Sequence, residues 1–346
     1  MKNRFRKTAK IALVMVYLVI TAGALVRMTG SGMGCPDWPK CFGYFVPPTD
    51  ISELEFKPNH DYKKGVVIIV DEALQVATKT FKSGDTLNLN NWEPYTKHDY
   101  AVFNPLHTWV EYINRLIGAL SGLPILVFTV LSLWLWRDQK RFLILSVLTV
   151  FAMGFQAWLG KTVVDSNLAP YKITIHMVMA LVIVAIILYL IYASKSDYKN
   201  QKHDPTFRNV LIITTLLTLV QIVIGTQVRQ FVDVQNKLNG YFNWDLTEMT
   251  PIVFYVHRSF SIMVLVLNVW LFARNKKLRL GYNKFKLVIV CIGLEILTGI
   301  LMYYFNFPFS SQPIHLIIAA ILIGIQFYII LESHYSKALK SELKRT

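Results

Sequence analysis

Two segments of this chain repeat one arrangement of a polar residue, a glycine and a histidine. Residues 156–160 (Gln-Ala-Trp-Leu-Gly) are followed by His176, and residues 295–299 (Glu-Ile-Leu-Thr-Gly) are followed by His315. In both copies the histidine lies 16 residues beyond the glycine, between two long apolar runs. Neutral imidazole suits haem iron, and an ionisable group at membrane depth indicates function. The repeat therefore predicts a protein whose two related halves each hold a haem.

Four histidines stand toward the same ends of even-numbered apolar runs, namely His107, His176, His257 and His315. A single buried histidine could serve packing alone, but several at related positions favour ligation. Pairing His257 with His315 would clamp one haem in the second half. The residue that aligns with His257 in the first half is Asn114, a poor iron ligand. The first-half site is therefore held by His176 alone, or it recruits His107 as well.

Glu111 is the other residue in an apolar run whose ionisable group is costly to place at membrane depth. It lies four residues after His107 and three before Asn114, so the three share one helix face. A carboxylate beside a haem could move protons or position water or oxygen. The alternative is an ion pair with Arg115. The second half has no carboxylate at the matching place, which predicts that one half reacts and the other only holds or passes electrons.

Arginines near the ends of the same runs are suited to haem propionates, because guanidinium pairs with carboxylates in a bidentate way. The alternative is that each arginine reaches up to the membrane interface without a specific partner. The arginines concerned are Arg27, Arg115, Arg229 and Arg258.

Two of the three cysteines, Cys35 and Cys41, lie just past the first apolar run. In an oxidising compartment they would close a short loop as a disulfide. A redox-active or haem-handling thiol pair is the alternative. The third, Cys291, lies inside an apolar run and is expected to pack.

The elements that must position these residues are eight membrane-spanning helices, because each apolar run is about 20 residues long and only closed hydrogen bonding survives in lipid. The fold class is therefore an all-α polytopic membrane protein. The runs cover roughly residues 11–27, 108–136, 142–164, 173–193, 209–228, 252–273, 287–305 and 313–332.

The chain has a net charge of +15, and the positions of its charges are those expected for a membrane protein. Lysine and arginine gather before the first run, in every second connection and at the C-terminal end, which is the positive-inside pattern. Both termini are therefore expected in the cytoplasm, and a nucleic-acid partner is not expected. Cleavage of the first run as a signal peptide is an alternative, but it would spoil this parity.

The chain is expected to form two four-helix halves, residues 1–194 and 205–346, joined by a polar stretch. Four helices per half give both copies the same orientation, as in parallel repeats. Residues 44–105 form an insert outside the membrane that only the first half has. Within it, residues 66–70 (Val-Val-Ile-Ile-Val) predict a short strand.

The segment from Gly23 to Cys41 (GALVRMTGSGMGCPDWPKC) resembles the sequence that follows the first helix of haem A synthases. The resemblance continues in order through Glu111–Arg115, Gln156–His176, the pair His257-Arg258 and the closing His315. It covers nearly the whole chain outside the insert.

This resemblance implies eight helices in two pseudo-equivalent bundles. The C-terminal bundle would bind haem b through His257 and His315 as an electron carrier, and the N-terminal bundle would bind the substrate, haem O. The enzyme would oxidise the C8 methyl group of haem O to a formyl group by successive oxygen-dependent hydroxylations. Glu111 matches the family's catalytically important glutamate.

Three positions bear on how closely the chain follows that family. Cys35 and Cys41 match an outer cysteine pair of some members, whose second pair is missing here. Asn114 stands where the family usually has a histidine for the substrate haem. This departure concerns the coordination of the reacting haem and leaves the second haem site unaffected.

Two other functions fit the histidines: a di-haem b-type cytochrome that oxidises quinol, and a haem-binding or transport protein without turnover. Glu111 weighs against both. The expected surroundings are the lipid bilayer of a bacterial cytoplasmic membrane, since no Arg/Ser-rich transit segment is present, with the outer loops in the periplasm. The expected partners are a haem O synthase and the assembly of a terminal oxidase; the electron donor is left open.

Overall fold

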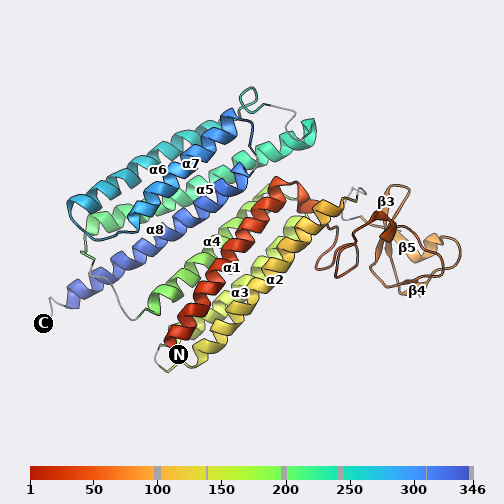
Figure 1. The fold of residues 1–346 in the computed structure, drawn as a ribbon, viewed down its shortest axis with the longest axis horizontal. Helices are drawn as coiled ribbons and strands as arrows, with labels where there is room; N and C mark the ends of the chain where they lie inside the picture. Colours follow the sequence, from red (N-terminus) through yellow and green to blue (C-terminus); the bar gives the residue numbers. More distant parts are fainter. Residues whose placement is uncertain (97–102, 138, 196–200, 241–244, 309, 343–346) are drawn as a thin grey trace. The chain divides into compact units, whose positions relative to one another are not determined.

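The computed structural model describes residues 1–96, 103–137, 139–195, 201–240, 245–308 and 310–342. Within them, eight helices are long and apolar enough to cross a membrane, which confirms the predicted fold class (Figure 1). They are α1 (Lys2–Met28), α2 (Pro105–Leu133), α3 (Lys140–Val164), α4 (Pro170–Ala193), α5 (Pro205–Asn239), α6 (Ile252–Lys277), α7 (Phe285–Tyr304) and α8 (Ser311–Glu342).

Three helices, α1, α5 and α8, extend well beyond the apolar runs that predict them. Helix α1 begins at Lys2, because lysine and arginine are good helix formers and Phe5 of this first segment is buried. The Phe5 ring packs edge-on against Phe128, with ring centroids 5.7 Å apart. Helix α5 continues to Asn239 through a polar segment whose Val232 is buried. Hydropathy alone misses such ends, since only one face of each is apolar.

Residue contacts divide the chain into two compact units, and each of the first four helices is divided between them. The first unit comprises Met1–Thr21, Ser121–Gly154 and Met177–Thr346, and the second comprises Ala22–Leu120 and Phe155–His176. The division into sequence halves 1–194 and 205–346 is a different kind of boundary, drawn from the internal repeat, and it stays a prediction.

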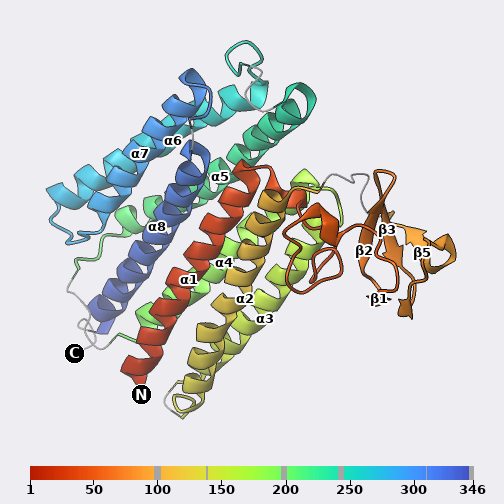
Figure 2. The ribbon, with the colours of Figure 1, turned by 45° about the vertical axis from the view of Figure 1, so that its right-hand side comes forward.

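The first unit contains the whole of α5 to α8, which lie side by side (Figure 2). Helix α5 packs against α6 and α8, and α7 packs against α6 and α8. Phe207, Tyr282 and Phe285 are fully buried in one core cluster of these helices. The Phe207 and Tyr282 rings are stacked, with centroids 4.8 Å apart.

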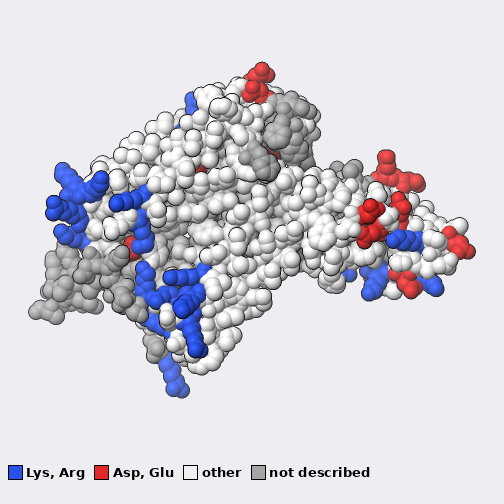
Figure 3. Space-filling model, in the orientation of Figure 1, with Lys and Arg blue, Asp and Glu red and all other residues white. Residues whose placement is uncertain are grey.

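The charges of this unit are gathered at its helix ends. Figure 3 shows lysine and arginine side chains at one end of its helices and a long uncharged surface beyond them. Arg274, Lys276 and Lys277 occupy the last turn of α6, at this basic end. An uncharged belt between charged ends is what a lipid-spanning bundle requires.

The insert belongs to the second unit and folds as two small antiparallel sheets. Strands β1 (Asp61–Tyr62) and β4 (Phe81–Lys82) form one, and β2 (Val67–Val70), β3 (Ala73–Ala77) and β5 (Trp92–Pro94) form the other in the order β2-β3-β5. Strand β2 confirms the strand predicted at 66–70 to within one residue. Tyr62 and Trp92 are buried against each other, with ring centroids 5.0 Å apart. The insert is thus an ordered cap; its residues 97–102 lie outside the described part.

Candidate functional site

Each odd-numbered helix places a glycine against a polar side chain of the helix that follows it. A Cβ atom added to Gly225 would lie 3.0 Å from Cε1 of His257, a tight contact, so the glycine lets that ring lie close to the backbone of α5. At the other glycines the added atom would lie 3.4 to 3.9 Å from the facing side chain. The four pairs are Gly23 with Asn114, Gly160 with His176, Gly225 with His257 and Gly299 with His315.

Asn114 therefore occupies, in the first pair, the place that a histidine has in the other three. Its Oδ1 atom is buried and has no hydrogen-bond partner among the described residues. A buried amide oxygen without a partner is costly in a folded protein. This geometry agrees with the sequence alignment of Asn114 with His257.

Two of the three histidines accept a hydrogen bond from a glutamine, which lies four residues before the glycine that faces the histidine. Gln156 Nε2 donates to the backbone oxygen of His176 at 3.0 Å, and Gln221 Nε2 donates to that of His257 at 2.9 Å. In each case the same nitrogen lies 3.4 Å from the ring nitrogen Nε2. Sequence reasoning missed Gln221, although the spacing shared with Gln156 was available to find it.

His257 and His315 face each other inside the first unit. Their ring centroids are 6.5 Å apart. Two imidazoles on opposite sides of one iron have ring centres about 6 Å apart, given metal–nitrogen bonds of about 2 Å. His257 Nδ1 is buried without a partner among the described residues. The pair therefore fits a haem held by two histidines.

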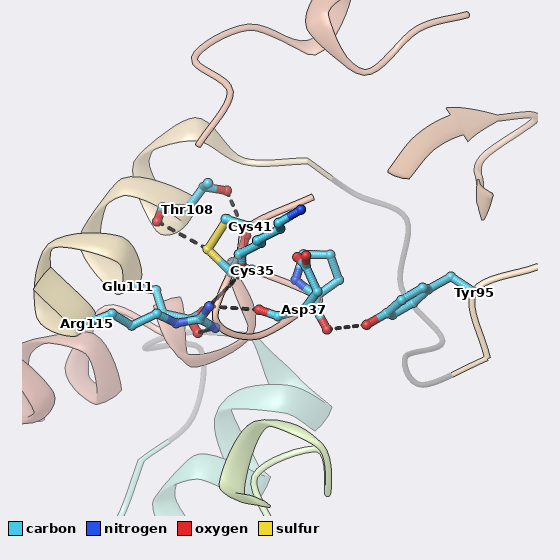
Figure 4. Close-up of polar contacts among 10 residues, drawn as sticks. Cys35, Asp37, Cys41, Tyr95, Thr108, Glu111 and Arg115 are labelled. Carbon is cyan, nitrogen blue, oxygen red and sulfur yellow. Dashed lines mark hydrogen bonds and ion pairs between the residues drawn. A yellow bond between two sulfur atoms is a disulfide. The ribbon is translucent and has the colours of Figure 1, made fainter. Parts of the chain in front are cut away.

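Glu111 is buried, only 3% exposed, in the second unit (Figure 4). One oxygen, Oε1, forms an ion pair with Arg115 one turn along α2. The other, Oε2, accepts a hydrogen bond from the backbone N–H of Cys35 at 3.0 Å. The ion pair with Arg115, given as the alternative in the sequence analysis, is thus present, and both oxygens of this carboxylate are held by the protein.

The loop that holds Glu111 is closed by a Cys35–Cys41 disulfide, which confirms the pairing favoured by the sequence. Arg115 Nη1 donates to the backbone oxygens of Asp37 at 2.7 Å and Lys40 at 2.9 Å, both inside this loop. Disulfide, loop, arginine and glutamate are therefore one connected structure, as Figure 4 shows.

The same loop is tied to the insert. Tyr95 Oη, just past β5, donates to the backbone oxygen of Pro36 at 2.6 Å. Asp37 Oδ2 accepts from the N–H of Gly43 at 2.9 Å. Burial raises the pKa of Asp37, although the Gly43 hydrogen bond opposes this shift. The insert thus stabilises the loop that positions Glu111.

The second half has an aromatic residue where Glu111 would fall. Counting three residues back from His257 gives Phe254, which stacks on Tyr303 with ring centroids 4.7 Å apart. This contact belongs to an apolar cluster that includes Val232 and Phe307. The difference between the halves expected from the sequence is therefore visible in the packing.

His107 lies in the first turn of α2, where its N–H donates to Asn104 Oδ1 at 3.2 Å. Its backbone packs closely against Gly34. Asn114 lies seven residues further on, about 10 Å along the helix axis. Ligation by His107 stays a prediction.

The arginines predicted to bind propionates lie near helix ends and contact this chain's own groups. One pairs with Glu111, another pairs with Asp233 at 2.8 Å, and a third lies over the ring of Tyr255, 5.4 Å from its centroid. Propionate binding stays a prediction. In chain order they are Arg27 in the last turn of α1, Arg115, Arg229 and Arg258.

Comparison with known proteins agrees with this arrangement. A family model described as cytochrome oxidase assembly protein, COX15-CtaA, matches residues 6–83 and 90–327. The heme A synthase of Ehrlichia canis (strain Jake) is 26% identical over 94% of this chain and 91% of its own length. The heme A synthase of Flavobacterium johnsoniae is 24% identical, with 91% and 93% covered. That of Listeria monocytogenes serotype 4a is 22% identical, with 99% and 100% covered.

The family match spans the helices of both halves, most of the insert, the disulfide loop and the four positions that face glycines. The chain therefore belongs to the COX15-CtaA family of cytochrome oxidase assembly proteins, the family of the haem A synthases.

Proposed function

We propose that this protein is a haem A synthase that oxidises the C8 methyl group of haem O to a formyl group. The observation that carries the proposal is Glu111, a buried carboxylate of α2 that is held by the backbone N–H of Cys35 in the disulfide loop and by Arg115. Asn114 lies on the same face of α2, where the second unit would receive the substrate. A carrier of electrons or a haem transporter has no need of such a carboxylate.

The second half would hold haem b as a resident cofactor between His257 and His315. Their separation and the glycines behind them support this assignment. When bound, haem b supplies one-electron transfer. The residues themselves orient the imidazoles: Gln221 fixes His257 through its backbone oxygen, and α7 and α8 fix His315.

In the first half, His176 would bind the substrate iron on one side, fixed by Gln156. Asn114 would offer no iron ligand on the other side, which would leave that side accessible to dioxygen. Hydroxylating the methyl group twice gives a geminal diol, which loses water to become the formyl group. The protons and electrons for reducing dioxygen come from outside the substrate.

Glu111 is placed to handle those protons. Its Oε2 can release or accept a proton while the Cys35 N–H holds the carboxylate in position, and Arg115 stabilises the charged form through Oε1. The disulfide loop keeps this group at the face of α2 that carries Asn114.

We also place the protein in a bacterial cytoplasmic membrane, with both termini in the cytoplasm and the insert in the periplasm. The basic ends of the helices support this orientation. Haem O would arrive from a haem O synthase, and haem A would go to a terminal oxidase during its assembly.

The deciding experiment is co-expression with a haem O source in a host that makes no haem A. Extracted haems are separated by chromatography, and the haem b of the purified protein is recorded by its spectrum. We expect haem A from the unaltered protein, none from Glu111→Gln, and equal haem b in both. The exposed Glu72→Gln serves as the control. Bound haem without any haem A would instead identify a cytochrome or a transporter.

A further inference from the structure

Glu295 of α7 is a buried carboxylate that the proposed reaction does not use. It stands four residues before Gly299, at the position that Gln156 and Gln221 occupy in their helices. Where the glutamines contact the backbone oxygen of their histidine, Glu295 contacts the ring: its Oε2 lies 2.9 Å from Nδ1 of His315. The chain thus has a charged residue at one of three equivalent places.

The contacts of His315 decide which nitrogen carries its proton. Thr298 Oγ1 lies 2.8 Å from Nδ1 and also 2.8 Å from the backbone oxygen of Leu294. A hydroxyl has one proton, and within the helix it goes to that backbone oxygen. Nδ1 is therefore the donor to both Thr298 and Glu295, which leaves the lone pair of Nε2 for iron.

Among the described residues, no lysine or arginine forms an ion pair with Glu295. Within the same residues, its Oε1 is buried without a hydrogen-bond partner. His257, across the 6.5 Å gap, has no acceptor on its own Nδ1 within the same residues. One imidazole of the pair is thus bonded to a carboxylate and the other is not.

We propose that Glu295 is a positioning residue that fixes the Nδ1-protonated form of His315 and lowers the reduction potential of the haem b bound there. A carboxylate that accepts the Nδ1 proton makes the imidazole a stronger electron donor, which favours the ferric iron. Thr298 shares the proton and orients the ring. The inference rests on the proposed binding of haem b by His257 and His315.

The test is a redox titration of the haem b band in the purified full-length protein. Glu295→Gln puts the residue of the other two sites at this position, with the same shape and no charge. We expect at least a tenfold shift of the one-electron equilibrium toward the reduced form, a rise of about 59 mV, together with an altered electron paramagnetic resonance signal of the ferric haem. Glu332→Gln, which removes a buried carboxylate of α8 that does not contact His315, should leave both readings unchanged.

An unchanged potential in Glu295→Gln with haem b bound would overturn the inference, as would an equal shift in Glu332→Gln. If Glu295→Gln does not accumulate, Thr298→Val is the deciding variant. It leaves Glu295 as the sole acceptor for the Nδ1 proton, so the reduction potential should stay the same or fall. A rise would show that the Thr298 hydroxyl, and not Glu295, lowers the potential. Purified protein without any haem b would contradict the proposed cofactor site as well, whereas unchanged potentials contradict this inference alone.

Discussion

At the scale of residues, the first half differs from the other sites at Asn114, which faces Gly23 where histidines face Gly160, Gly225 and Gly299. We expect Asn114→His to bring a second imidazole to the substrate iron. The substrate haem should then turn low-spin, because a second nitrogen ligand binds its iron. Absorption spectra of the purified protein measure this change. Asn114→Ala, which adds no ligand, is the control, and a spectrum of Asn114→His equal to that of the unaltered protein would contradict the open side.

The pair Glu111–Arg115 makes a second prediction. Arg115→Ala leaves Glu111 charged and buried without its partner, a change that costs about 3–5 kcal/mol in other proteins. We expect a matching loss of thermal stability in detergent and loss of haem A. Lys286→Ala, an exposed change in α7, should have no effect. Equal stability of the two variants would show that Glu111 does not need this arginine.

At the scale of elements, the disulfide loop orders the end of α2. Closing a loop as short as Cys35–Cys41 is worth about 2 kcal/mol by chain entropy. The double variant Cys35→Ser/Cys41→Ser should lose about that stability and most of its haem A yield, while haem b in the other half is kept. Cys291→Ser of α7 is the control. Haem A formation at the normal rate would show that the backbone N–H of residue 35 holds Glu111 without the disulfide.

Asp204, the N-cap residue just before helix α5, makes two kinds of contact. Asp204 accepts from the N–H of Thr206 as an N-cap and pairs with Arg274 of α6 at 2.6 Å. The Arg274 hydrogen bond lowers the pKa of Asp204. A lowered folded-state pKa means that the stabilisation is present above the ordinary pKa of aspartate and is lost as the pH falls through the lowered value.

Asp204→Ala should therefore cost about 1 kcal/mol at neutral pH through the cap alone, plus the pair. The deficit should shrink in acid, because a protonated Asp204 loses its ion pair with Arg274, and thermal unfolding across a pH series would show this change. Asp204→Asn keeps a capping oxygen and should lose less. A deficit that persists unchanged at low pH would assign the effect to packing.

Helices and sites differ in how far the sequence predicts them. Apolar length predicts all eight helices, and the parallel repeat aligns Asn114 with His257, because periodicity and spacing are local properties. The sequence does not predict the polar ends of α1 and α5, since their burial depends on partners such as Phe128 that lie far along the chain. The sequence does not predict the Cys35–Glu111 hydrogen bond for the same reason, because this bond joins a loop and a helix 76 residues apart.

At the scale of the whole molecule, the charge pattern predicts an orientation that reporter fusions can measure. Alkaline phosphatase fused after residue 85, in the insert, should be active, because it would reach the periplasm. Fusions after residues 137 and 280 should be inactive, since both places lie among basic connections. A green fluorescent reporter at the same sites should give the opposite pattern. Activity after residue 280 would reverse the proposed topology.

The hydrogen bond from Tyr95 to Pro36 gives the insert a consequence of its own. It continues a covalent and hydrogen-bonded path from the sheets, through the disulfide loop, to Glu111. A water-soluble binder raised against the insert would thus act, through this path, on the carboxylate that we propose to be catalytic. In the proposed topology such a reagent would reach the insert from the periplasm without entering lipid.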